Sequence, residues 1–243
     1  NIATSESYNG TSWTETNDLN TGRPQLGGSG AYTAAIAVGG DSSTAAETFN
    51  GTSWTSVPSL ATARGRSGIT GNSSSALCAG GYNGSYIAIT EKYDGSSWTE
   101  VGNLNTNRAN QGSAGTSTAA LTISGNGPSG VVTDVEQWNG TGWTEIASVN
   151  RARGNAGSGG TVTTALFFGG EPSGENTEYY DGTSWTEVAN LATDRYQISR
   201  GNVGTAELGI CIGGTGPAGP NPILTATEEW VIPDTLTKTF TVS

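Results

Sequence analysis

The chain repeats one pattern of aromatic, small polar and apolar positions five times. In each copy an aromatic residue is followed by Asn or Asp, then Gly, two small residues and a tryptophan. These tryptophans recur at intervals of 41, 44, 45 and 42 residues and are Trp13, Trp54, Trp98, Trp143 and Trp185. No segment has sustained helical periodicity. Short apolar runs within a repeat of this length predict a unit of four antiparallel strands.

Each repeat offers four strand positions, which we name a to d. Strand a follows a repeated arginine and is rich in small residues. Strand b is an apolar run that ends in Gly-Gly or, in the third repeat, in Ser124-Gly125. Strand c carries Glu-x-aromatic, and strand d begins with the tryptophan. The Asn-Gly or Asp-Gly between c and d predicts a hairpin with a type I′ turn. One such sheet cannot bury both faces, so a radial arrangement, in which each sheet covers the next, is favoured. The prediction is an all-β propeller of five blades with four antiparallel strands each.

These features resemble the kelch repeat, which has Gly-Gly after strand b, an aromatic residue at the end of strand c and a tryptophan on strand d. The resemblance covers roughly residues 5–230 and implies a kelch-like β-propeller. Kelch propellers more often have six or seven blades, whereas the five copies here predict five.

The repeats begin and end in mid-unit. We expect one domain over residues 1–230, with blades at about 19–60, 61–104, 105–149, 150–191 and 192–230 plus 5–16. The N-terminal strand, residues 11–16, then supplies strand d of the last blade and closes the ring. The alternating segment 235–243 competes for the same place. If the N-terminal strand takes it, residues 231–243 form an arm that pairs with another chain or domain.

Five arginines stand where strand d leads into strand a, and they should form a ring on one face near the axis. They are Arg23, Arg64, Arg108, Arg153 and Arg195. One interpretation is a site for anions. The other pairs each arginine with the glutamate of its own repeat, and having one glutamate per arginine favours this structural role.

The b–c loops differ in length and content from blade to blade, and varied loops on a repeated scaffold are where binding usually resides. They supply the candidate ligand-binding residues Asp41, Tyr82, Tyr86, Asn126, Glu171 and Glu175. The alternative is that these are solvent-exposed turns without a ligand.

Composition excludes several kinds of chemistry. The chain has no histidine, which excludes histidine bases and histidine metal ligands. Strand a lacks the paired carboxylates that a glycosidase needs. We therefore expect no enzymatic activity, no cofactor and no metal. The two cysteines, Cys78 and Cys211, lie in blades that are not neighbours and should be buried free thiols. A net charge of −11 argues against nucleic acid as a partner, and no apolar run is long enough for membrane insertion.

The near-identical segments aromatic-Asn/Asp-Gly-Thr-Ser-Trp-Thr-Glu also resemble repeats in tail-fibre and virion-surface proteins of marine bacteriophages. This resemblance implies an extracellular or virion-surface structural protein, a tail-fibre or capsid-decoration component with a role in adhesion or assembly. Its partners would be other virion proteins, a further copy bound through the C-terminal strand, or a host-surface glycan or protein. The alternative is a multivalent lectin with sites on the b–c loop face.

Overall fold

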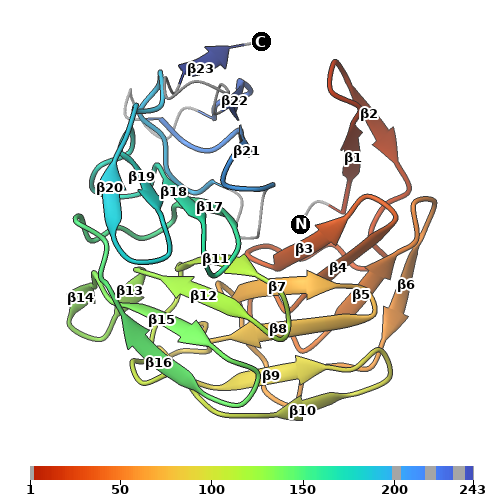
Figure 1. Ribbon diagram of the computed structural model, residues 1–243. Helices are drawn as coiled ribbons and strands as arrows, with labels where there is room; N and C mark the ends of the chain where they lie inside the picture. Colours follow the sequence, from red (N-terminus) through yellow and green to blue (C-terminus); the bar gives the residue numbers. More distant parts are fainter. Residues whose placement is uncertain (1–2, 199–203, 217–222, 232–238, 243) are drawn as a thin grey trace.

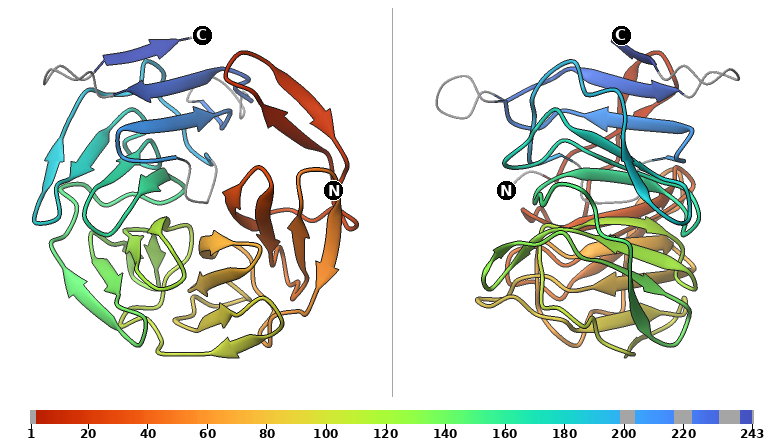
Figure 2. Two further views of the ribbon diagram at one scale, coloured as in Figure 1. Left: turned by 45° about the vertical axis from the view of Figure 1, so that its right-hand side comes forward. Right: turned by 60° about the vertical axis from the view of Figure 1, so that its left-hand side comes forward.

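The structure is a computed structural model that describes residues 3–198, 204–216, 223–231 and 239–242. All regular structure in these residues is β-strand, and the sheets are arranged around an axis as a β-propeller (Figures 1 and 2). Four sheets have four antiparallel strands each. No helix in the described part of the chain is long and apolar enough to span a membrane.

The four complete sheets, blades 1 to 4, follow one another along the chain. Each pairs its strands in the order a-b-c-d, as predicted. Blade 1 contains β3 (Gly27–Ala31), β4 (Ala34–Val38), β5 (Ala46–Phe49) and β6 (Trp54–Val57). Blade 2 contains β7 (Gly68–Asn72), β8 (Ser75–Ala79), β9 (Thr90–Tyr93) and β10 (Trp98–Glu100). Blade 3 contains β11 (Gly112–Gly115), β12 (Ala120–Ile123), β15 (Val135–Trp138) and β16 (Trp143–Ile146). Blade 4 contains β17 (Gly157–Gly160), β18 (Ala165–Phe168), β19 (Thr177–Tyr180) and β20 (Trp185–Glu187).

Two smaller sheets complete the ring. The fifth sheet consists of β21 (Leu208–Ile212), β22 (Thr227–Val231) and β23 (Thr239–Val242). The N-terminal hairpin consists of β1 (Ser5–Tyr8) and β2 (Trp13–Thr16). A short hairpin, β13 (Asn126–Gly127) and β14 (Gly130–Val131), lies in the b–c loop of blade 3.

The prediction of five four-stranded blades needs correction, because the described residues contain four. In the fifth repeat, the expected strand a falls on residues 199–203, which lie outside the described part. The predicted closure by the N-terminal strand is also wrong. That strand pairs with β1, and strand β23 occupies the place beside β22. Pairing β2 with β1 closes only a short loop, which costs less chain entropy than pairing it with a strand more than 200 residues away.

The c–d hairpins form as expected, but their turns are not of type I′. The loop has four residues, since the aromatic residue pairs directly with the tryptophan, as in Phe49↔Trp54. Asn50 Oδ1 accepts hydrogen bonds from the backbone N–H groups of Thr52 and Ser53, both at 2.9 Å. In blade 2 the same bonds, donated by Ser96 and Ser97, lower the pKa of Asp94 to about 2. An acceptor side chain therefore holds the turn in place of a second positive φ.

Apolar layers between neighbouring sheets form the core. Ile36 and Val38 of blade 1, for example, pack with Ile69, Cys78 and Tyr93 of blade 2. The strand a of each blade lies closest to the axis (Figure 2), where its small residues fit. The two cysteines are free and buried, as expected. Burial raises the pKa of the Cys211 thiol to about 12, so it remains protonated at neutral pH.

A buried Arg–Glu ion pair joins the parts of every repeat. Its members are Arg23–Glu47, Arg64–Glu91, Arg108–Glu136, Arg153–Glu178 and Arg195–Glu228. The pairing that the spacing favoured is thus present. In blade 4, Arg153 Nη2 lies 3.0 Å from Glu178 Oε1, and Arg153 Nη1 donates to the carbonyls of Gly169 and Asn176. Glu178 also accepts the backbone N–H of Asn150 at 2.7 Å.

Desolvation is the cost of this arrangement. It lowers the pKa of Arg153 to about 10 and outweighs the opposing effect of Glu178. The guanidinium therefore stays charged at neutral pH. Its buried positive charge is stabilised by the carboxylate and by the carbonyls around it.

Removal of one member of a buried Arg–Glu pair should strongly lower the stability of the fold. We expect Glu178→Gln to lower the free energy of unfolding by about 3–5 kcal/mol, because it leaves a buried guanidinium without its counter-charge. The matched control is Glu187→Gln in the same blade, since Glu187 pairs with Arg151 across 4.0 Å with both side chains about half exposed. That variant should lose about 0.5 kcal/mol or less. Urea unfolding measures the free energy of unfolding of both variants. Equal losses would show that the buried pair contributes no more to stability than the exposed pair.

Truncation tests which terminal strand completes the fifth sheet. Deletion of residues 232–243 removes β23, so we expect amide hydrogen exchange in β22 to accelerate as its backbone groups lose their partners. Deletion of residues 1–18 removes the N-terminal hairpin and should leave exchange in β22 nearly unchanged. The opposite ranking of the two deletions would contradict the observed pairing.

Candidate functional site

The d–a and b–c loops of each repeat are bonded together on one face of the propeller, which we call the loop face. Backbone bridges join the residue after the arginine to the residue after Gly-Gly, or after Ser124-Gly125 in blade 3. These bridges are Gly65↔Tyr82, Ala109↔Asn126, Gly154↔Glu171 and Tyr196↔Thr215. In blade 1 the bond runs from Asp41 N–H to Pro24 O at 3.0 Å. The varied loops therefore start from a common, fixed base.

Hydrogen bonds also tie the b–c loops of blades 1 to 4 to the next repeat. The second glycine of the pair donates its N–H to the carbonyl of the next repeat's arginine, as in Gly40 to Arg64 at 3.1 Å and Gly81 to Arg108 at 2.8 Å. In blade 1 the first glycine must be small, whereas in blade 3 Ser124 holds this position at φ 55° and its Oγ donates to Arg153 O at 2.8 Å. Gly39 has φ 67°, and a Cβ there would lie 2.3 Å from Arg64 O. The Gly-Gly signature thus permits close contact between adjacent blades.

A ring of polar residues that the sequence analysis missed surrounds the axis on this face. It lies two positions after each arginine, at φ between 56° and 61°, and consists of Gln25, Arg66, Asn110, Asn155 and Gln197. We call it the polar ring. Backbone N–H groups donate from blade to blade around it, with Arg66 to Gln25, Asn110 to Arg66 and Asn155 to Asn110 each at 2.9 Å. The signal was visible in the repeats, because this position always holds an amide or an arginine.

The polar ring connects with some of the predicted loop residues. Arg66 donates to Gln25 Oε1, and its guanidinium lies over the Tyr82 ring, 5.3 Å from the centroid. Tyr82 in turn meets Tyr86 edge to face at 5.3 Å. Both tyrosines are half-buried, so part of each ring faces solvent. This cluster combines aromatic surface, a cation and an amide.

The other predicted residues are more dispersed. Asn126 is half-buried, and its Oδ1 accepts from Asn110 Nδ2 at 3.1 Å. Asp41 and Glu171 are exposed at the beginnings of their loops. Glu175 is exposed at the other end of its loop, where its carbonyl accepts the N–H of Leu191. Among the described residues, no hydrogen bond or ion pair joins these three acidic side chains.

The loop face therefore suits recognition by hydrogen bonds and aromatic contact. The five arginines after strand d are 6% exposed or less and are bonded within their own repeats, so their guanidinium groups are unavailable to an outside anion. The described residues hold no cluster of three acidic, histidine or cysteine side chains that is suited to a metal ion. Part of the fifth b–c loop, residues 217–222, lies outside the described part of the chain.

Comparison with family models and with curated proteins finds no match. The assignment of function therefore depends on the geometry of this face and on the repeats themselves.

The role of Gly-Gly at this face can be tested by Gly39→Ala. The control is Gly84→Ala, which also lies in a b–c loop at positive φ, 111°, but where an added Cβ meets nothing within 4 Å. Both variants carry the strain of a positive φ, about 1–3 kcal/mol. Only Gly39→Ala adds a clash with a backbone carbonyl, so it should lose about 1–3 kcal/mol more in thermal or urea unfolding. Equal losses would contradict the close contact between blades.

Proposed function

We propose that this protein is a non-enzymatic, kelch-like propeller that serves adhesion or assembly on the surface of a virus particle. The observation that carries the binding role is the division within each repeat. Buried ion pairs and backbone bonds hold a constant frame, while the b–c loops differ in length and side chains. A rigid scaffold with varied loops is a common basis for recognition.

The lack of enzymatic activity is supported by where the repeated acids lie. Glu47, Glu91, Glu136, Glu178 and Glu228 are all 2% exposed or less and are bonded to arginines. Carboxylates neutralised in this way are poorly placed to donate or accept protons at a bound substrate.

The placement on a virus particle is supported by the resemblance of the repeats to those of phage tail-fibre and virion-surface proteins. A host glycan or surface protein is the proposed ligand, with Tyr82 and Tyr86 as the aromatic contacts and Asn126 as a hydrogen-bonding contact. Assembly through the C-terminal strand would use the outer edge of β23, because its other edge pairs with β22.

A lectin is the second candidate, and the tyrosine pair favours it. Two partly exposed aromatic rings beside amide side chains offer both stacking and hydrogen bonds to a sugar. The equivalent loops in the other blades lack this pair, which argues for one such site rather than one per blade.

Binding can be tested on an array of bacterial surface glycans and on intact bacterial cells. The double variant Tyr82→Ala/Tyr86→Ala should weaken any binding at least about tenfold, since loss of two aromatic contacts removes well over 1.4 kcal/mol. The control, Tyr32→Ala, removes a 56% exposed tyrosine from the a–b turn on the opposite face and should bind normally. Equal binding by both variants would place recognition elsewhere.

The location is tested separately with antibodies raised against the purified protein. Gold-labelled antibody should decorate intact virus particles from the source sample in electron micrographs. Labelling confined to cell contents would overturn the virion assignment, whatever the glycan array shows.

A further inference from the structure

Arg66 is the one cation of the polar ring, whose other members all carry side-chain amides. The chain as a whole is acidic, with a net charge of −11. Every other arginine of the described residues forms an ion pair with a glutamate, either within a blade or, for Arg151, at the surface. No carboxylate of these residues lies within ion-pair distance of Arg66. The loop face therefore carries a cation that the described part of the chain does not neutralise.

The contacts of the Arg66 guanidinium orient it and leave its far end open. Its Nε donates to Gln25 Oε1, and its Cζ lies over the Tyr82 ring, 5.3 Å from the centroid. Within the described residues, no acceptor takes a hydrogen bond from Nη1 or Nη2, and the side chain is partly exposed. Two such groups side by side match the two oxygens of a carboxylate. The guanidinium is thus held in place by two contacts that do not use these groups.

The polar ring does not need a positive charge in order to form. The bonds from blade to blade are made by backbone N–H groups, which are present whatever the side chain. In blade 3 the equivalent residue, Asn110, donates its Nδ2 to Asn126 Oδ1 at 3.1 Å, so an amide is enough to connect the ring with a b–c loop. Holding a long arginine side chain in one position also costs more conformational entropy than holding an asparagine. The charge of Arg66 therefore calls for a partner outside this framework.

Aromatic surface adjoins this cation. Tyr82 lies against the guanidinium, and Tyr86 meets Tyr82 edge to face with 5.3 Å between the ring centroids. Both rings are partly exposed, and the bridge Gly65↔Tyr82 fixes the base of the loop that carries them. A sugar acid presents an apolar C–H face and a carboxylate on one small ring. One such sugar residue can therefore contact both the tyrosines and the guanidinium.

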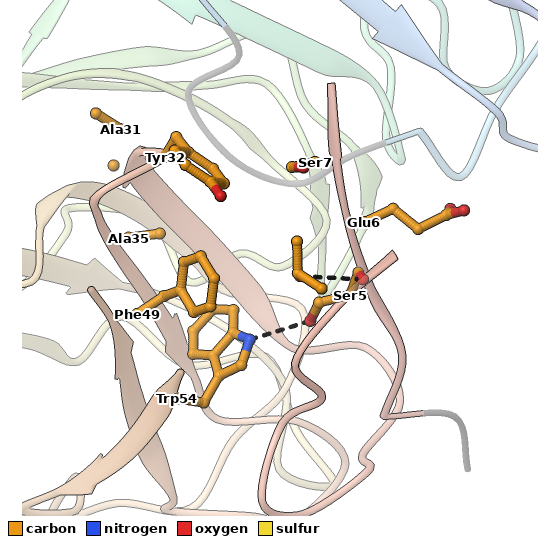
Figure 3. A pocket seen from close by; sticks show the side chains of 10 residues that line it. Ser5, Glu6, Ser7, Ala31, Tyr32, Ala35, Phe49 and Trp54 are labelled. Atoms are coloured by element: carbon orange, nitrogen blue, oxygen red, sulfur yellow. Dashed lines mark hydrogen bonds between the residues drawn. The ribbon is translucent and has the colours of Figure 1, made fainter. Parts of the chain in front are cut away.

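Another aromatic cavity of this propeller has the opposite charge. It has a volume of about 170 Å³ and lies between the N-terminal hairpin and blade 1, where Tyr32, Phe49 and Trp54 contribute to its lining (Figure 3). Glu6 is the one charged residue among the described residues that line it. A negative charge there disfavours a carboxylate. An acidic sugar therefore distinguishes the loop face from this cavity, whereas a neutral sugar does not.

We propose that Gln25, Arg66, Tyr82 and Tyr86, which we call the Arg66 cluster, bind a uronic acid residue of a glycan. The inference rests on the proposed function, in which the loop face recognises a ligand, and it names the chemical class of that ligand. The sugar carboxylate accepts hydrogen bonds from Nη1 and Nη2 of Arg66, and the sugar ring lies against the exposed parts of the two tyrosines. A phosphate ester would bring close to two negative charges to a single guanidinium, which favours the carboxylate.

Binding of oligogalacturonate, oligoglucuronate and oligomannuronate to the full chain tests the proposal. The methyl ester of each oligosaccharide supplies the same sugar without its charge. We expect at least one of the three acids to bind at least about tenfold more tightly than its ester, because hydrogen bonds between two charged groups are stronger than those to a neutral ester. Calorimetric titration measures both dissociation constants.

Two substitutions of Arg66 identify the source of this preference. Arg66→Gln should abolish it and still fold, because Gln25 and Gln197 hold the same position of their repeats at a similar positive φ. Arg66→Lys keeps the charge but not the paired donors, so it should retain only part of the preference. The matched control is Arg151→Gln, which removes one positive charge from an arginine about half exposed and should keep the full preference.

The possible outcomes separate this inference from the proposed function. If the parent protein binds none of the acids more tightly than its ester, or if Arg151→Gln loses the preference as fully as Arg66→Gln, the inference is overturned. Binding of neutral glycans or of cells that still depends on Tyr82 and Tyr86 would then leave the adhesive role intact. Loss of acid binding in Tyr32→Ala but not in Arg66→Gln would place the sugar in the cavity of Figure 3 and also overturn the inference.

Discussion

The buried pair of arginine and glutamate is the interaction on which this propeller depends. Each pair brings two charges out of water, which is favourable only when nearly all their hydrogen-bonding groups are satisfied. In blade 4 the guanidinium meets one carboxylate and the carbonyls that end strand b and precede strand c, while the carboxylate takes a backbone N–H from the incoming loop. One pair therefore fixes three segments of a repeat that has very short strands and few charged residues.

This frame separates stability from recognition. The arginines and repeated glutamates are used within the blades, and the Gly-Gly segments are used between them. The loop face carries a polar ring of amides with one guanidinium, in which Asn110 is buried, and loops that differ between blades surround this ring. Binding properties can change in those loops without disturbing the buried pairs.

The N-terminal hairpin follows the same pattern. It pairs Tyr8 with Trp13 as the c and d strands of a blade pair their aromatic residues, and it is hydrogen-bonded to blade 1 and to the fifth sheet. The C-terminal strand pairs with β22 within the fifth sheet.

The sequence by itself determined the repeat, the order of strands in the four complete sheets, the pairing of each arginine with its own glutamate and the two buried thiols. These follow from local spacing, which recurs in every copy. The tertiary structure alone decided the pairing of the two terminal strands, because both had suitable patterns and only their positions in the ring distinguish them. It also revealed the polar ring. The residues at that position are ordinary polar residues in the sequence, and they become a site only where five left-handed turns meet around an axis.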